Sequence, residues 1–160
     1  MPHGNALMIG VGGSGKISTC RLAAFSSGLK LFTHTMARNY GMEALLENLK
    51  ELYENCVVRP KVFMFNDSHV EQDNFLEVIN TVLTNAMVFG LYGDSDKDDL
   101  LLPLKNDMKR DQVPHSEEWN YYLEKLKDNL HLCLCFSPAG DTLRDRCRNF
   151  PGLVSNTVID

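Results

Sequence analysis

The sequence predicts an α/β fold, in which a parallel sheet is covered by helices on both faces. Short apolar runs alternate along the chain with longer segments whose apolar residues recur every three or four positions, the patterns of strands and amphipathic helices. Several short runs are apolar at every position, which is typical of strands buried on both faces of a parallel sheet. With 160 residues, 44% of them hydrophobic and 23% charged, the chain is long enough for one domain with a core.

Apolar runs in the first part of the chain predict strands at residues 6–9, 31–35 and 61–66. Between the first two strands we expect a helix that starts at residue 15 and is stopped by Ser26, Ser27 and Gly28. A second helix is expected to open at Gly41 and to end before Pro60, because one face carries apolar residues at helical spacing and the other carries charges.

The second part of the chain continues the alternation. A helix face is formed by Phe75, Leu76, Ile79, Val82 and Leu83, and another by Trp119, Tyr122, Leu123 and Leu126. Strands are expected at residues 131–137 and 157–159, with a short helix at 141–148 between them. Residues 93–118 carry eight acids and four bases, and we expect an exposed insertion or long loop there.

Composition excludes several classes of protein. The net charge of −5 argues against a nucleic-acid partner, and no run of apolar residues predicts a membrane span or a signal peptide, so we expect an intracellular protein. The five cysteines lack metal-ligand or C-x-x-C spacing and are expected to be reduced and mostly buried. Residues 1–42 contain four bases and no acid, whereas the remainder has a net charge of −9. A locally positive segment suits an anionic ligand.

That positive segment contains a glycine-rich loop, GVGGSGKIS. Gly10, Gly15 and Lys16 match the phosphate-loop pattern G-x-x-x-x-G-K, between a predicted strand and a predicted helix. Backbone N–H groups and the positive end of the helix would hold phosphate, and the lysine would reach the β and γ phosphates. The loop as a whole is Gly10, Val11, Gly12, Gly13, Ser14, Gly15, Lys16, Ile17 and Ser18.

The same loop also satisfies the dinucleotide pattern G-x-G-x-x-G through Gly10, Gly12 and Gly15. A dinucleotide site needs an acid about 20 residues further on to hold the ribose, yet the first acid after the loop is Glu43. The phosphate-loop interpretation is therefore favoured. The alternative is a glycine-rich turn that binds no phosphate and is followed by a lysine by coincidence.

The residue after the lysine departs from the motif. A serine or threonine there normally helps to hold Mg²⁺, but Ile17 offers no oxygen. Ser18 lies about 100° further around the helix, so it could replace that ligand only if the first turn is distorted. We expect phosphate binding to survive this change better than metal positioning.

The second half of a nucleotide site should be an apolar strand that ends in acids. The segment VFMFND has this form, but Asn66 stands at the first polar position and Asp67 only at the second. An amide lacks the negative charge that Mg²⁺ prefers, and Asp67 is one methylene shorter than the glutamate that usually polarises the attacking water. Misplacement on that scale slows a reaction strongly, so hydrolysis is expected to be weakened.

These motifs, together with FNDSHVEQDNFLEVINTVL, NLHLCLCFSPAGDTLRDRCRNFPGL and the final TVID, resemble the fourth AAA+ module of dynein heavy chains over the whole chain. The axonemal type is the more similar one. The resemblance implies a P-loop AAA+ large subdomain with a five-stranded parallel sheet and helices on both faces. It also implies that residues 1–160 are one subdomain of a much longer chain, from which the helical lid subdomain is absent.

The resemblance implies roles for individual residues. Residues 10–18 would bind the nucleotide, and Asn66 and Asp67 would occupy the acidic-strand positions, with Ser18 and Asn66 nearest to Mg²⁺. Ser137 would end the strand whose tip senses the γ-phosphate, although an amide is more usual there. Arg146 would be presented to the neighbouring module's nucleotide. Arg144 and Arg148 are weaker candidates, and a solvated helix face is the plain alternative for all three.

The resemblance further implies ATP or ADP with Mg²⁺ as ligands, and neighbouring AAA+ modules, microtubules and other dynein chains as partners. It places the parent motor in the cytoplasm on the cytoskeleton, the axoneme of a cilium being favoured, with no nucleic acid and no membrane involved. Two functions stay open: an ATPase module with weakened hydrolysis, or a structural module that holds nucleotide without hydrolysing it. A free-standing small-molecule kinase is disfavoured because no acceptor site is recognisable.

Overall fold

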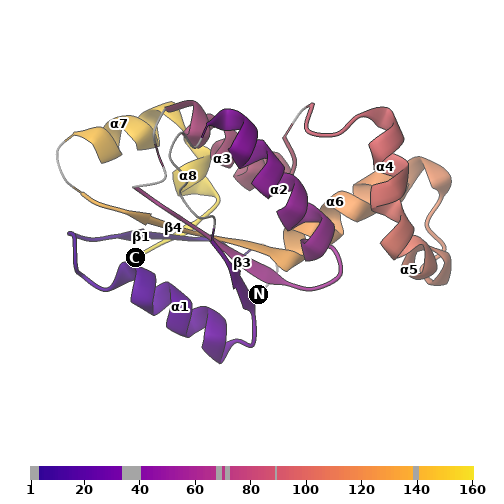
Figure 1. Ribbon diagram of the computed structural model, residues 1–160, viewed down its shortest axis with the longest axis horizontal. Coiled ribbons are helices and arrows are strands. Elements are labelled where there is room, and N and C mark those ends of the chain that lie inside the picture. Colours follow the sequence, from indigo (N-terminus) through magenta and orange to yellow (C-terminus); the bar gives the residue numbers. More distant parts are fainter. Residues whose placement is uncertain (1–3, 34–40, 68–69, 71–72, 89, 139–140) are drawn as a thin grey trace.

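The fold is built on a five-stranded, entirely parallel sheet, shown in the computed structural model of Figure 1. The structure describes residues 4–33, 41–67, 70, 73–88, 90–138 and 141–160. The strand order is β2-β3-β4-β1-β5. The strands are β1 Ala6–Ile9, β2 Lys30–Phe32, β3 Lys61–Asn66, β4 Leu130–Phe136 and β5 Val158–Ile159.

Helices cover both faces of this sheet, as the sequence predicts. In Figure 1, α1 lies on one face, while α2, α3, α7 and α8 lie on the other. Right-handed crossovers explain this division, because the connection from β1 to β2 runs toward one edge and later connections run toward the other. The helices are α1 Lys16–Ser26, α2 Met42–Cys56, α3 Asp73–Asn85, α4 Asp94–Leu101, α5 Lys105–Arg110, α6 Glu118–Asn129, α7 Thr142–Asn149 and α8 Gly152–Ser155.

Most predicted elements are confirmed within a residue or two. Strands β1 and β3 have the predicted bounds, and β4 begins and ends one residue earlier than expected. Strand β2 is shorter than the predicted 31–35, and the end of that range, from residue 34, lies outside the described residues. Helix α8 was not expected. It packs on α3, where the backbone N–H of Gly152 donates to the Asn80 side chain at 2.8 Å.

The prediction of an exposed loop at residues 93–118 is wrong. This segment forms α4 and α5 with two short 3-10 helices, η2 Leu102–Leu104 and η3 His115–Glu117. The many acids concealed an apolar face, because Leu100, Leu104 and Met108 recur at helical spacing and are buried. The carboxylate of Asp96 accepts the Gly93 backbone N–H at 3.1 Å, which caps the start of α4.

Two cores fill the two faces of the sheet. The larger lies under α2, α3 and α6 and includes Phe63 and Phe65 of β3. The smaller lies under α1 and includes Val62 and Met64. Alternate residues of β3 thus enter opposite cores, because side chains alternate along a strand. This explains the apolar run at residues 62–65.

The cysteines are free thiols, as expected. Cys20, Cys133 and Cys135 are buried in the smaller core, Cys56 is buried in the larger, and Cys147 is partly exposed. Among the described residues, no helix has the length and apolar character that crossing a membrane requires.

The register of the sheet brings three strand ends together. Ile9 at the end of β1 pairs with Phe136 of β4, and Asn66 at the end of β3 pairs with Cys135 of β4. Residues that follow β1, β3 and β4 therefore meet at one edge. Ligands of open α/β sheets bind at this carboxyl edge.

Candidate functional site

The glycine loop connects β1 to α1 in a shape that has a positive φ at two positions, both occupied by glycine. Gly13 and Gly15 have φ of +80° and +88°, in the left-handed region that side chains rarely adopt. A Cβ on Gly10 would lie 2.6 Å from the Ser14 hydroxyl oxygen. The predicted strand-loop-helix arrangement is therefore confirmed.

The start of α1 is open to an anion. Helix α1 begins at Lys16 after Gly15, no side chain caps it, and its first turn contains no acid. The first N–H groups of a helix lack intrahelical partners and carry the positive end of the helix dipole. Such an uncapped end binds phosphate well.

Lys16 places its ammonium group inside the loop. Its Nζ donates to the carbonyl oxygens of Gly10 at 2.5 Å and Val11 at 2.9 Å, and contacts the Ser14 hydroxyl at 3.4 Å. These oxygens hold the ammonium group of Lys16 at a position where it would contact a phosphate chain bound in the loop. A bound polyphosphate would exchange these neutral oxygens for charged ones, which make stronger hydrogen bonds with an ammonium group.

The loop faces the ends of β3 and β4 across a cleft of about 410 Å³. Asn66, Asp67 and Ser137 lie in this cleft together with Lys16, although they come from three separate parts of the sequence. The lining residues are Gly12, Gly13, Gly15, Lys16, Ile17, Ser18, Asn66, Asp67, Cys135 and Ser137. Of the predicted site residues, Gly10, Val11, Ser14 and Arg146 do not line it. Cys135 was not predicted, and it lies there because β4 pairs with β3 beside Asn66.

Both carboxylate oxygens of Asp67 are engaged. Its Oδ2 accepts the backbone N–H of Ser137, and its Oδ1 accepts a hydrogen bond from Nη1 of Arg146 at 3.1 Å. The Arg146 side chain is 17% exposed and that of Asp67 is 35% exposed. Asp67 is therefore held against the end of β4 by a backbone amide and an ion pair.

The Asp67–Arg146 pair could not be found from the sequence, because 79 positions separate the two residues. Helix α7 carries three arginines, and only their burial distinguishes them: Arg144 and Arg148 are exposed. The presentation of Arg146 to a neighbouring module stays a prediction. In this structure the residue is bound within its own chain.

The metal-binding side of the cleft is poor in ligands. Ile17 lines the cleft, is 36% exposed and offers no oxygen. Ser18 lines it as well, so a hydroxyl is available one position later. In the described part of the chain, no group of three or more His, Cys, Asp or Glu side chains could hold a metal ion. The assignment of Mg²⁺ to Ser18 and Asn66 stays a prediction.

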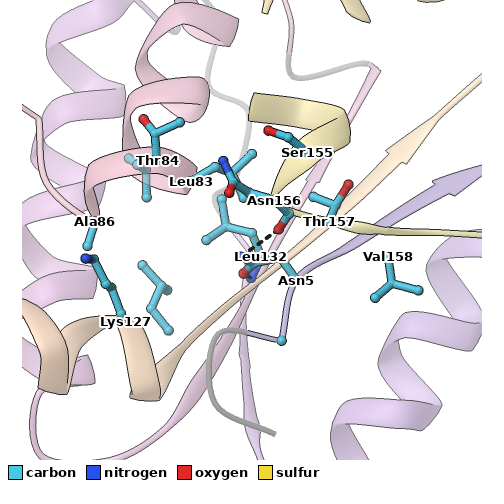
Figure 2. A pocket seen from close by; sticks show the side chains of 13 residues that line it. Asn5, Leu83, Thr84, Ala86, Lys127, Leu132, Ser155, Asn156, Thr157 and Val158 are labelled. Atoms are coloured by element: carbon cyan, nitrogen blue, oxygen red, sulfur yellow. Dashed lines mark hydrogen bonds between the residues drawn. The ribbon is translucent and has the colours of Figure 1, made fainter. Parts of the chain in front are cut away.

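A slightly larger cavity, of about 430 Å³, lies at the opposite edge of the sheet (Figure 2). It is reached by Asn5 and Leu132, at the amino ends of β1 and β4. The Asn5 side chain at this cavity is engaged within the chain: it donates to the Asn156 carbonyl at 3.2 Å and accepts the Leu132 N–H at 2.9 Å. The phosphate loop does not contribute to it. The carboxyl-edge cleft is therefore the candidate functional site.

A parallel sheet with this loop, lysine and cleft defines a P-loop domain of the AAA+ large-subdomain type. The comparison with known families agrees over the whole chain, since the model described as "P-loop containing dynein motor region D4" matches residues 1–160. The chain belongs to this family of dynein motor regions. The recognition of a fourth dynein AAA+ module is thereby confirmed.

The relatives of the chain are dynein heavy chains. It is 46% identical to the Dynein-1-alpha heavy chain of the flagellar inner arm I1 complex of Chlamydomonas reinhardtii and 43% identical to Dynein axonemal heavy chain 10 of Homo sapiens, in each case over 100% of this chain and 4% of the relative. It is 38% identical to Dynein axonemal heavy chain 5 of Rattus norvegicus, over 99% of this chain and 5% of the relative. The similarity is therefore to the axonemal type, and the chain spans about 4% of these relatives' length.

Proposed function

We propose that this chain is an ATP- and ADP-binding module of an axonemal dynein heavy chain, and that hydrolysis at its site is weakened. The observation that carries the binding proposal is the loop itself. An uncapped helix end, glycines in left-handed conformations and the ammonium group of Lys16 converge on one cleft. This arrangement binds a polyphosphate chain through backbone N–H groups and a single positive charge.

The weakened hydrolysis rests on two side chains of the same cleft. Ile17 has no oxygen at the position where the motif expects a ligand of Mg²⁺. Asp67 is one methylene shorter than the usual glutamate, and contacts with Ser137 and Arg146 hold its carboxylate in place, so it cannot move toward an attacking water without breaking these contacts. Mg²⁺, when bound, supplies charge neutralisation at the phosphates, and Ser18 and Asn66 would hold it.

At the level of the whole protein, we propose that residues 1–160 form one large α/β subdomain in a ring of AAA+ modules. Neighbouring modules of the same heavy chain, other dynein chains and microtubules are the proposed partners. The axoneme of a cilium or flagellum, part of the cytoskeleton in the cytoplasm, is the proposed location. The names of the relatives support a dynein heavy chain in an axoneme or flagellum, and the ring and the microtubule partner are proposed from the family resemblance.

Replacing Lys16 with alanine tests nucleotide binding. We expect the affinity for fluorescent ATP and ADP analogues to fall about tenfold or more, because a charge-assisted hydrogen bond to phosphate contributes roughly 1.5–3 kcal/mol. Lys30→Ala is the matched control, since Lys30 is an exposed base of the same positive segment and lies outside the cleft. Unchanged affinity in Lys16→Ala would refute the proposed function.

A second function, nucleotide holding without hydrolysis, is favoured by the doubly engaged carboxylate of Asp67. Phosphate release by the intact motor in multiple turnovers separates the two functions. If this site hydrolyses ATP, Asp67→Asn in this module alone is expected to reduce the rate clearly, because the amide cannot accept a proton from water. A rate unchanged by Asp67→Asn, with nucleotide binding retained, would identify a non-hydrolysing module.

A further inference from the structure

The ion pair of Asp67 and Arg146 joins a lining residue of the cleft to an arginine that is largely buried. The guanidinium of Arg146 lies 5.8 Å from the centre of the Phe136 ring, and its Nη1 donates to Asp67. Its Nε is buried and has no hydrogen-bond partner in the described part of the chain. A largely desolvated guanidinium beside a carboxylate interacts with it more strongly than an exposed pair does. The arginine is therefore placed to neutralise Asp67.

This neutralisation matters because the cleft has few charges. Of the described residues that line it, Lys16 is basic and Asp67 is acidic, so the lining by itself is neutral. Arg146 is not among the lining residues, but its hydrogen bond to Asp67 brings one positive charge next to that carboxylate. With the pair intact, Arg146 neutralises the carboxylate of Asp67. The positive charge of Lys16 is then left to interact with a bound phosphate chain.

The third phosphate of a nucleotide is the one that we expect to lie nearest to Asp67. A phosphate-loop lysine contacts the β and γ phosphates, and Asp67 and Ser137 line the same cleft as this lysine. A diphosphate lacks the third phosphate and the charge that it carries. Repulsion by an unpaired carboxylate would therefore act on ATP more than on ADP. Ile17 provides no ligand for Mg²⁺, so less of the phosphate charge would be neutralised by the metal. More of that neutralisation must then come from basic residues of the protein.

We infer that Arg146 is a specificity-determining residue that acts within its own chain. By pairing with Asp67 it keeps that carboxylate compensated, so that the cleft accepts a nucleoside triphosphate as well as a diphosphate. Arg146 acts through Asp67 and is a positioning residue, not a catalytic one. The inference rests on the proposed nucleotide binding and extends it to discrimination between ATP and ADP.

The test compares ATP and ADP binding in charge variants at this pair. Fluorescent ATP and ADP analogues are titrated against the chain at low ionic strength in EDTA, so that Mg²⁺ does not compensate the phosphates. In Arg146→Gln, we expect the ratio of the ATP to the ADP dissociation constant to rise about fivefold or more. The difference should shrink as salt is added, because the repulsion is electrostatic.

Two further variants separate charge compensation from packing. Arg146→Lys keeps the charge, and its ratio is expected to stay near that of the unaltered chain. Arg146→Gln combined with Asp67→Asn removes both charges, and its ratio is expected to return to within about twofold of the unaltered chain, because the repelling carboxylate is gone. A purely structural role of Arg146 predicts no such recovery.

Arg144→Gln is the matched control, since Arg144 is an exposed base of the same helix, and its ratio is expected to be unchanged. Equal weakening of ATP and ADP in Arg146→Gln, or a raised ratio that persists in the double variant, would overturn the inference. An unchanged ratio in Arg146→Gln would overturn it too and would favour action on a neighbouring module. In all three cases the unaltered chain still binds nucleotide through Lys16, so the proposed function would survive.

Discussion

Replacing Ile17 with threonine is expected to make nucleotide binding strongly dependent on Mg²⁺. Threonine supplies the hydroxyl that the phosphate-loop motif uses as a metal ligand, at a position that lines the cleft. Removing Mg²⁺ with EDTA should weaken ATP binding in the variant by about tenfold or more, which corresponds to about 1.4 kcal/mol or more of metal-dependent binding. In the unaltered chain the same treatment should weaken ATP binding by a smaller factor, because Ser18 and Asn66 would hold the metal without a ligand from Ile17.

Ile17→Val is the matched control, because valine has the β-branched shape of threonine without the oxygen. It is expected to behave like the unaltered chain. Equal Mg²⁺ dependence in Ile17→Thr and Ile17→Val would show that Ile17 does not limit metal binding. The proposed cause of weakened hydrolysis would then lie with Asp67 alone.

Replacing Phe65 with alanine is expected to lower the free energy of unfolding by about 3–5 kcal/mol. Phe65 is 0% exposed, its ring centre lies 6.2 Å from that of Phe63, and it pairs with Leu134 of β4 in the middle of the sheet. Since domains are stable by roughly 5–15 kcal/mol, this loss removes a large part of the total. Urea unfolding followed by circular dichroism measures it.

Phe25→Ala controls for the loss of an aromatic ring as such. Phe25 lies on α1 and is 83% exposed, so the same substitution should change the free energy of unfolding by less than about 0.5 kcal/mol. A similar loss at both positions would contradict the assignment of Phe65 to the core and of Phe25 to the surface.

The phosphate loop and the buried strands could be predicted from the sequence because their causes are local. A run such as residues 62–65 is apolar at every position, a pattern that is typical of a strand covered on both faces. Gly10, Gly15 and Lys16 are close in sequence, so their spacing already contains the geometry of the turn. The helices within 93–118 were not predicted because charged residues dominate the composition of this segment. That its leucines are buried is evident only from the folded structure, where they pack into the core.

The ion pair of Asp67 and Arg146 could not be predicted in the same way. Neighbouring residues determined the strand-loop-helix unit, the polar ends of β3 and β4 and the absence of a hydroxyl at Ile17, because each depends on short-range spacing. The folded chain alone brings Arg146 onto Asp67, 79 positions away, and buries it beside Phe136 while Arg144 and Arg148 stay in solvent. The sequence does not distinguish the three arginines of this short helix. The position of α7 in the folded chain determines that Arg146 is desolvated and paired with a carboxylate.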